Sequence, residues 1–207
     1  MTPTELLVTE RLYSRLARAS DLRAELEAFR ELAILGAADP DKAVQRFLEL
    51  AIHLCPAAGS AGLSELEVDD KGDGLFRWTA LAGEFAPYVG GGTPRDFSPC
   101  GLCLDRGRTI LVERPDRVFT YLAEAHVPIV EGLIVPLGKP SHVGTIWIAS
   151  HSDQVRGFDR TDAQVMEHLA AQLFMTLNLR RLRRRLDEAG SPSFASEPCA
   201  KQLNEAQ

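Results

Sequence analysis

Apolar residues recur every three or four positions near the start of the chain, which is the spacing of an amphipathic helix. Between Thr4 and Leu35 they form a narrow stripe with Arg and Glu between them: Leu12, Leu16, Ala19, Leu22, Leu26, Phe29 and Ala33. Such a stripe is typical of a helix that pairs with another helix. A second helix, with a wider apolar face, is expected to have Asp39 as N-cap and Pro40 as first residue, and to end before Pro56.

A third amphipathic pattern lies near the C-terminus, before the last part of the chain. Asp159 is the expected N-cap of this helix, with Asp162 in its first turn, and the packing face is Val165, Met166, Leu169, Leu173 and Leu177. The stripe then rotates to Met175, Leu179, Leu182 and Leu186, the pattern of a short coiled coil. Five arginines lie between Arg180 and Arg185, and such a run is typical of a solvated face.

Runs of β-branched and aromatic residues in the middle of the chain predict an antiparallel sheet. Strands are expected at Ala61–Val68, Leu75–Leu81, Thr109–Val112, Glu131–Leu137 and Val143–His151, the last two at the centre of the sheet. A turn at 69–74 joins the first two strands, and short helical connections are expected at 84–89 and 116–124. Because a slip of one residue would exchange the faces of the sheet, the pattern does not assign each aromatic residue to a face.

Composition and charge exclude several classes of protein. The net charge of −6 over 207 residues argues against nucleic acid as the main partner. No apolar run approaches the roughly 18–20 residues that span a bilayer, and the first residues lack the apolar core of a secretory signal. Four cysteines are too few for a disulfide scaffold. We therefore expect a cytoplasmic protein that binds neither nucleic acid nor a membrane.

The stretch Gly90–Arg108, GGGTPRDFSPCGLCLDRGR, is not explained by the needs of a core. Its glycines predict a loop too irregular for helix or strand, after which Ser98 and Pro99 predict a helix start and Gly107 a helix end. Cys100 and Cys103 then lie one turn apart, where the helix dipole would lower a thiol pKa and favour a thiolate or an anionic ligand. The alternative is an ordinary surface loop with two buried thiols.

From about Pro40 to about Leu177 the chain resembles a GAF domain. The resemblance rests on the segments GSAGLSELE, FSPCGLC, EGLIVPL, HVGTIWIASH and FDRTDAQVMEHLAAQL, in that order. It implies an α+β fold in which terminal helices cover one face of an antiparallel sheet and loops cover a small-ligand pocket on the other. GAF domains typically regulate an output module such as a histidine kinase or a transcription regulator, and no such module is legible in this sequence.

This resemblance, taken with the residue patterns, divides the chain into a signalling or dimerisation helix (1–36), a GAF domain (37–178), a helical extension (179–190) and a disordered tail (191–207). We expect a non-enzymatic sensor that binds a small molecule, with no metal and no catalytic residue; the sequence does not identify the ligand or a cofactor. The candidate ligand-binding residues are Phe97, Cys100, Cys103, Asp105, Tyr121 and Glu131. The exposed stripes of the first and last helices predict a parallel homodimer with the arginines facing solvent.

Two alternatives use the cysteines differently. Cys100 and Cys103 could form a thiol redox switch, or the active site of an enzyme like the free methionine-(R)-sulfoxide reductase of the GAF family. That enzyme has another cysteine before its fourth strand, where this chain has His126–Val130 without one. The same two cysteines have the spacing of half a zinc site, which His126, His142 or His151 would have to complete.

Overall fold

The structure is a computed structural model that describes residues 2–68, 74–138, 143–154 and 156–190. Its centre is an antiparallel sheet of six strands in the order β3-β2-β1-β6-β5-β4. The strands are β1 (Ser60–Val68), β2 (Gly74–Gly83), β3 (Gly92–Pro94), β4 (Ile110–Glu113), β5 (Glu131–Leu137) and β6 (Gly144–Ser150). The predicted α+β class is confirmed, with β5 and β6 inside the sheet as expected. The predicted turn at 69–74 falls almost wholly outside the described residues.

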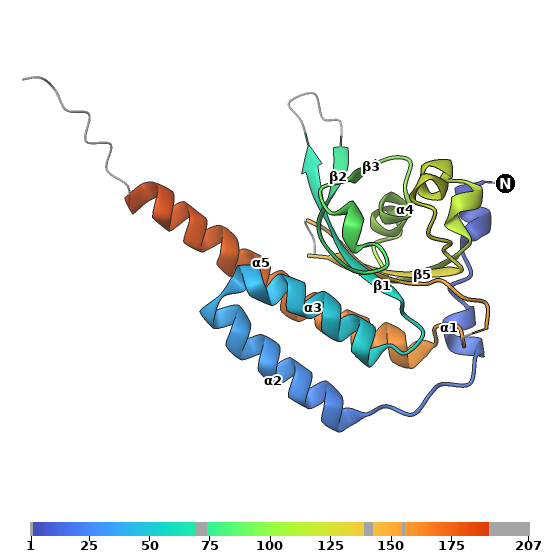
Figure 1. The fold of residues 1–207 in the computed structure, drawn as a ribbon, viewed down its shortest axis with the longest axis horizontal. Helices are drawn as coiled ribbons and strands as arrows, with labels where there is room; N and C mark the ends of the chain where they lie inside the picture. The colour runs from blue at the N-terminus through green and yellow to red at the C-terminus, as the bar shows by residue number, and fades with distance from the viewer. Residues whose placement is uncertain (1, 69–73, 139–142, 155, 191–207) are drawn as a thin grey trace, which may run out of the picture.

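Three long helices cover one face of this sheet (Figure 1). They are α2 (Leu22–Ala38), α3 (Pro40–Leu54) and α5 (Arg160–Gly190); α3 and α5 pack on the strands and α2 lies outside them. Asp39 caps α3 and Pro40 is its first residue, as predicted. The wide apolar face of α3 buries Phe47 and Leu48 completely. Burial of that face against the sheet is what positions the helical layer.

Short helices cover the opposite face. They are η2 (Ala86–Tyr88), α4 (Pro99–Arg106), η3 (Pro115–Arg117) and η4 (Thr120–Ala125). The single helix expected at 116–124 is therefore two 3-10 helices, and Pro115 begins the first of them. The prediction of an irregular loop at the start of Gly90–Arg108 is wrong for Gly92–Pro94. This segment pairs with β2, because the open edge of that strand supplies partners for its backbone groups.

The predicted single helix from Thr4 to Leu35 is wrong. Its first part is an extended arm that contains only η1 (Pro3–Leu6) and α1 (Arg11–Ser14), and α2 begins after Asp21, whose carboxylate accepts the Ala24 N–H at 3.0 Å. We call residues 2–20 the N-terminal arm. It lies along the edge strand β4, where Leu7 bridges to Val112 and the Val8 N–H donates to the Leu111 carbonyl oxygen. The open edge of β4 thus gains backbone partners that a helical arm would not supply.

Helix α5 begins with a reciprocal cap, as predicted at Asp159. The Asp159 carboxylate accepts the Thr161 N–H at 2.7 Å, and Asp162 accepts the Asp159 N–H at 3.0 Å. Burial alone would raise the pKa of Asp159, but hydrogen bonds from the Arg156 side chain and from the backbone N–H groups of Arg18 and Thr161 hold that pKa below its ordinary value. The predicted packing face of α5 is buried throughout.

The second half of α5 projects beyond the sheet (Figure 1). Met175, Leu179, Leu182 and Leu186 are all exposed on it. The expectation that the arginines face solvent is wrong for Arg180: one of its nitrogens donates to both Glu65 carboxylate oxygens at 2.8 Å, and its side chain is 12% exposed. The tail predicted to be disordered, 191–207, lies outside the described residues. Within the part of the chain that the structure describes, no helix is long and apolar enough to cross a membrane.

Candidate functional site

A cavity of about 60 Å³ lies between the sheet and the short helices that cover it. Trp78, Gly132, Ile134, Trp147 and Ala149 line it from the sheet. Among the described residues, those that line it from the cover include Phe85, Pro99, Cys100, Pro115, Leu122 and Ile129. None of the described residues that line the cavity carries a charge, so this lining offers an apolar environment for a small molecule.

Aromatic rings form one wall of the cavity. Phe85 meets Trp78 and Trp147 edge-on, with ring centroids 6.2 and 5.8 Å apart. The Trp147 ring lies over Gly62, where a Cβ atom would come within 2.1 Å of it, so a side chain at this position would displace the indole. Trp147 Nε1 donates to the Ser64 hydroxyl at 2.9 Å, which fixes the ring above β1.

The opposite wall is the start of α4. As predicted, Ser98 caps this helix by accepting the Gly101 N–H at 3.0 Å, Pro99 is its first residue, and Gly107 ends it with φ 59°. A Cβ atom on Gly101 would lie 1.9 Å from the Arg95 carbonyl oxygen, so only glycine allows the helix to pack this closely on the preceding loop. These local features hold Cys100 against the cavity.

The two thiols of α4 are buried and have different partners. The Cys100 thiol donates to the Ser64 hydroxyl at 3.6 Å, and the Cys103 thiol donates to the Ile134 carbonyl oxygen at the same distance. Burial raises the pKa of both thiols. The prediction that the helix start lowers a thiol pKa is therefore wrong, because the loss of hydration outweighs the dipole of a short helix. Both side chains are neutral thiols near neutral pH.

Two buried hydroxyl groups near this wall form no hydrogen bond of ordinary geometry among the described residues, although one lies close enough to Tyr121 and the other to Cys100 to act on the pKa of that neighbour. They are Oγ1 of Thr93, on β3, and Oγ1 of Thr145, on β6. Thr93 is 2% exposed and lines the cavity, whereas Thr145 is fully buried and is not among the lining residues. Sequence reasoning missed Thr93, because a threonine beside a glycine-rich loop carries no signal of burial.

Of the six predicted ligand-binding residues, the structure places only Cys100 in the cavity wall. Cys103 is fully buried but does not line the cavity. Phe97 is 44% exposed and its carbonyl oxygen accepts the Tyr121 hydroxyl at 3.1 Å, so this pair lies at the outer surface of the cover. Asp105 forms an ion pair with Arg95 at 2.6 Å on the exposed side of α4.

Glu131 faces the other side of the sheet. Along β5, Gly132 and Ile134 face the cavity, whereas Leu133 and Val135 pack in the core beneath the helices. Because side chains alternate along a strand, Glu131 belongs to the helical face. It therefore cannot contact a ligand in this cavity.

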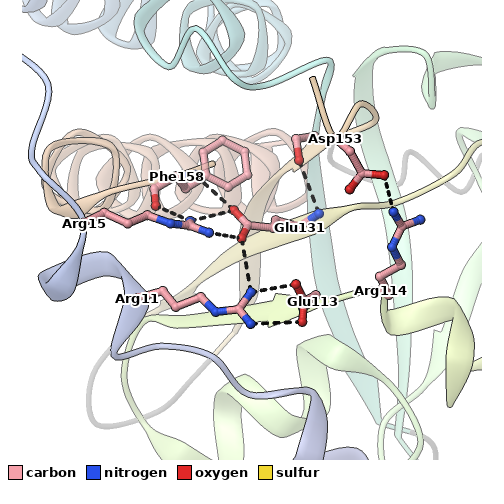
Figure 2. Close-up of polar contacts among 8 residues, drawn as sticks. Arg11, Arg15, Glu113, Arg114, Glu131, Asp153 and Phe158 are labelled. Carbon is pink, nitrogen blue, oxygen red and sulfur yellow. Dashed lines mark hydrogen bonds and ion pairs between the residues drawn. The ribbon is translucent and has the colours of Figure 1, made fainter. Parts of the chain in front are cut away.

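Glu131 is instead the centre of a polar cluster that holds the N-terminal arm (Figure 2). Arg15 donates to both oxygens of Glu131, at 2.6 and 2.9 Å, and to the Phe158 carbonyl oxygen at 2.7 Å. Arg11 donates to both oxygens of Glu113, on β4, at 2.6 and 3.2 Å. We call these two arginines and Arg18 the arginine clasp.

Arg18 completes the clasp. Its side chain donates to Asp162 and to the Leu54 carbonyl oxygen, each at 2.7 Å, and its backbone N–H donates to Asp159 at 2.8 Å. The arm thus joins the β4–β5 edge beside the cavity to the end of α3 and the start of α5. Sequence reasoning missed this cluster because it placed the arginines between the apolar residues of one continuous helix.

Of the histidines considered as metal ligands, the two that the structure describes, His126 and His151, do not form a metal-binding group with the cysteines. His151 contacts the Ser60 hydroxyl through Nε2 and the Pro128 carbonyl oxygen through Nδ1, each at 2.7 Å. His126 is exposed, and His142 lies outside the described residues. No group of three His, Cys, Asp or Glu side chains that could hold a metal ion occurs in the described part of the chain.

Comparison with known proteins gives a family for most of the chain. A family model described as "GAF domain" matches residues 37–178. No curated protein sequence matches the chain significantly.

Solved structures share the fold at low sequence identity. The GAF domain from a phosphoenolpyruvate-protein phosphotransferase of Coxiella burnetii matches with a TM-score of 0.66 at 16% identity, over 81% of this chain and all (100%) of that one. The free methionine-R-sulfoxide reductase of Neisseria meningitidis, solved with its substrate, gives 0.62 at 19%, over 82% and 97%. The photosensory core module of a Stigmatella aurantiaca phytochrome gives 0.61 at 13%, over 84% and 40%.

Proposed function

This chain belongs to the GAF domain family, and we propose that it is a non-enzymatic sensor that binds a small molecule in the cavity and signals through its terminal helices. The observation that carries the proposal is the position of the cavity. It lies on one face of β5 and β6, and the helix that leaves the domain, α5, packs on the other face of the same strands.

Alternation along these strands gives the mechanism. Gly132 and Ile134 line the cavity, while Leu133, between them, is fully buried in the core that includes Leu169 of α5. A ligand that moves β5 therefore moves the surface on which α5 rests. The clasp adds a second connection, because Glu131 directly precedes Gly132 and binds Arg15, which also contacts the Phe158 carbonyl oxygen just before α5.

Mass spectrometry of small molecules released from the purified, denatured protein tests the proposal. The wild-type chain should release a compound that an Ala149→Leu variant lacks, because the larger side chain fills the cavity that Ala149 lines. Ala123→Leu, on an exposed position of η4, is the matched control and should retain the compound. Release of the same compound by Ala149→Leu would refute binding in this cavity.

The exposed stripe on α5 supports a second part of the proposal, a homodimer through the terminal helices. Met175, Leu182 and Leu186 are each more than half exposed, at 67%, 54% and 61%. Each such side chain contributes about 1.5–3 kcal/mol when it leaves water, before the cost of ordering the partners. A histidine kinase or a transcription regulator is the expected kind of output partner for such a bundle.

Sedimentation of the full chain tests the dimer. The double variant Leu179→Glu, Leu182→Glu should be monomeric where the wild type is dimeric, because charge would enter the apolar contact. Glu188→Lys, at an exposed position on the opposite side of α5, is the control and should stay dimeric. A monomeric wild type at tens of micromolar protein, or a dimer that tolerates both charges, would refute this part.

A thiol enzyme is the alternative function. It is favoured by two cysteines one turn apart and by the similar fold of the methionine sulfoxide reductase. The raised pKa of both thiols weighs against it, since the thiolate is the attacking species. Consumption of free methionine sulfoxide with a thiol reductant, lost in Cys100→Ser and Cys103→Ser variants, would establish the enzyme and overturn the non-enzymatic proposal.

A further inference from the structure

One segment of the cover leaves the sheet and returns to it at the same place. We call residues 115–125, which contain η3 and η4, the lid. The lid connects the neighbouring strands β4 and β5. Its two ends are fixed side by side, because the Arg114 N–H donates to the Val130 carbonyl oxygen at 3.0 Å. Pro115 and Leu122 of the lid line the cavity.

The backbone is strained at both ends of the lid. Among the described residues, only Arg114 and His126 combine a side chain with a positive φ, of 45° and 54°. A side chain disfavours this conformation, and the residue before a proline, as Arg114 is, normally has an extended backbone. Such strain persists only where the surrounding structure enforces it, and it is common in segments that switch between conformations. Opening of the lid would release it.

Side chains hold the lid against the rest of the domain. In the described part of the chain, the backbone–backbone hydrogen bonds of the lid stay within the lid and its two flanking residues. The Tyr88 hydroxyl donates to the Ala125 carbonyl oxygen, and the Tyr121 hydroxyl of the lid donates to the Phe97 carbonyl oxygen at 3.1 Å. The Phe97 and Phe119 rings meet edge-on, with centroids 5.1 Å apart. Contacts of this kind can break while the sheet stays folded, because no hydrogen bond between strands is lost.

The lid lies over the part of the cavity wall that holds Cys100. Burial, and with it the nearby Cys100 thiol, raises the pKa of the Tyr121 phenol, whereas a hydrogen bond with the Thr93 side chain lowers that pKa. Tyr121 therefore lies close to two residues of the wall. Opening of the lid would expose and hydrate the Cys100 thiol. Cys55, in the core beneath the helices on the other face of the sheet, would stay buried.

We propose that the lid opens as a unit about Arg114 and His126 and that this motion admits the small molecule to the cavity. This inference rests on the proposed sensor function, since it describes how the same cavity is entered. The open form is the minor one, because it exposes the buried side chains of Phe119 and Leu122 to water. A molecule that contacts Pro115 and Leu122 from inside the cavity favours the closed form.

Labelling of the full-length protein with methyl methanethiosulfonate measures lid opening. This small uncharged reagent reacts with thiols faster than iodoacetamide does, and mass spectrometry of peptides gives the rate at each cysteine. Cys100 should be labelled faster than Cys55, because the lid opens more often than the whole protein unfolds. Low concentrations of urea should change the rate at Cys100 little and that at Cys55 steeply, because lid opening exposes less surface than unfolding. Equal rates and equal urea dependence at the two cysteines would overturn the proposal.

Three variants separate lid opening from global unfolding. Tyr88→Phe removes one hydroxyl that holds the lid and should raise the labelling rate of Cys100 about fivefold, the effect of one hydrogen bond. Tyr13→Phe, at an exposed ring of the N-terminal arm, is the matched control and should change no rate. Asp39→Ala removes the N-cap of α3 and should raise the rate at Cys55 about fivefold without changing that at Cys100. A rate at Cys100 that rises with Asp39→Ala but not with Tyr88→Phe would overturn the proposal.

Opposite substitutions at His126 test the hinge. Its side chain is exposed, so replacing it removes no buried contact. His126→Gly should slow the labelling of Cys100 about threefold, because glycine adopts the closed φ without strain. His126→Val should accelerate it by a similar factor, because a β-branched residue disfavours that φ. Unchanged rates in both variants would overturn the hinge.

The lid and the sensor function can fail separately. A compound released by the wild type, together with a rate at Cys100 that ignores Tyr88→Phe and both His126 variants, would refute the lid alone. Labelling that follows the lid variants, in a wild type that releases no compound, would refute the sensor function alone.

Discussion

Replacing Arg15 with Met should destabilise the protein much more than replacing Arg11 with Met. Both arginines lie in the N-terminal arm and each approaches a carboxylate at 2.6 Å. Their environments differ, since the side chain of Glu131 is 4% exposed and that of Glu113 is 41% exposed. The two pairs have the same shortest nitrogen–oxygen distance, so burial is the main difference between them, although Arg11 also lies 3.9 Å from Glu131 and Arg15 also donates to the Phe158 carbonyl oxygen.

The expected loss in the free energy of unfolding depends on the carboxylate that each variant leaves without its partner. Without Arg15, Glu131 keeps the Phe158 N–H at 3.1 Å and the Arg11 guanidinium at 3.9 Å but loses two donors, and its charge remains poorly hydrated. Removal of one partner of a buried pair costs about 3–5 kcal/mol. Because the Arg15 side chain is 27% exposed, water can partly replace it, and we expect a loss of about 2–3 kcal/mol in the free energy of unfolding. The exposed Arg11 pair is worth about 0–1 kcal/mol.

Urea unfolding followed by circular dichroism measures both values. High salt should reduce the cost of Arg11→Met and change that of Arg15→Met little, because screening acts mainly on exposed charges. The double variant Arg15→Met, Glu131→Gln should recover part of the stability, since no buried charge remains unpaired. Equal costs for the two single variants, or a double variant with the summed loss, would refute the reasoning.

Three further predictions concern α4 and the start of α5. At pH 8 iodoacetamide should label Cys100 and Cys103 in urea but not in the folded protein, because burial raises both pKa values; labelling of folded protein at the rate of a free thiol would contradict this. Ser98→Ala should lower the free energy of unfolding by about 1 kcal/mol through loss of the N-cap, and an unchanged urea midpoint would speak against that cap. The pKa of Asp159 is lower in the folded than in the unfolded chain, so its contribution is complete above about pH 4–5 and is lost as the pH falls through the folded value. Asp159→Asn should accordingly flatten the acid limb of a stability–pH curve, and an unchanged acid limb would exclude this carboxylate as its source.

The sequence by itself determined the features that depend on a few neighbouring residues. Caps at Asp39, Ser98 and Asp159 form where they were predicted, because a side-chain oxygen that satisfies a free N–H at a helix start needs only local geometry. Strand β5 has the predicted bounds, since a run of apolar residues between turn signals defines a buried strand. The order of these segments was enough to identify the GAF domain family. The match of the family model over residues 37–178 establishes that family.

Tertiary structure alone decided which chemistry these elements present. Alternation along β5 left open which face is the cavity, and packing gave Gly132 to the cavity and Glu131 to the arginine clasp. The expected thiolate at α4 depended on solvent access, and burial against the sheet reversed the direction of the pKa shift at Cys100. The N-terminal arm is not the predicted helix, because its arginines bind carboxylates more than 100 residues away in the sequence, as Arg15 binds Glu131. A local residue pattern does not encode such a long-range contact. Caps and strand limits are local properties, whereas burial, face and ion pairing are set by residues distant in sequence.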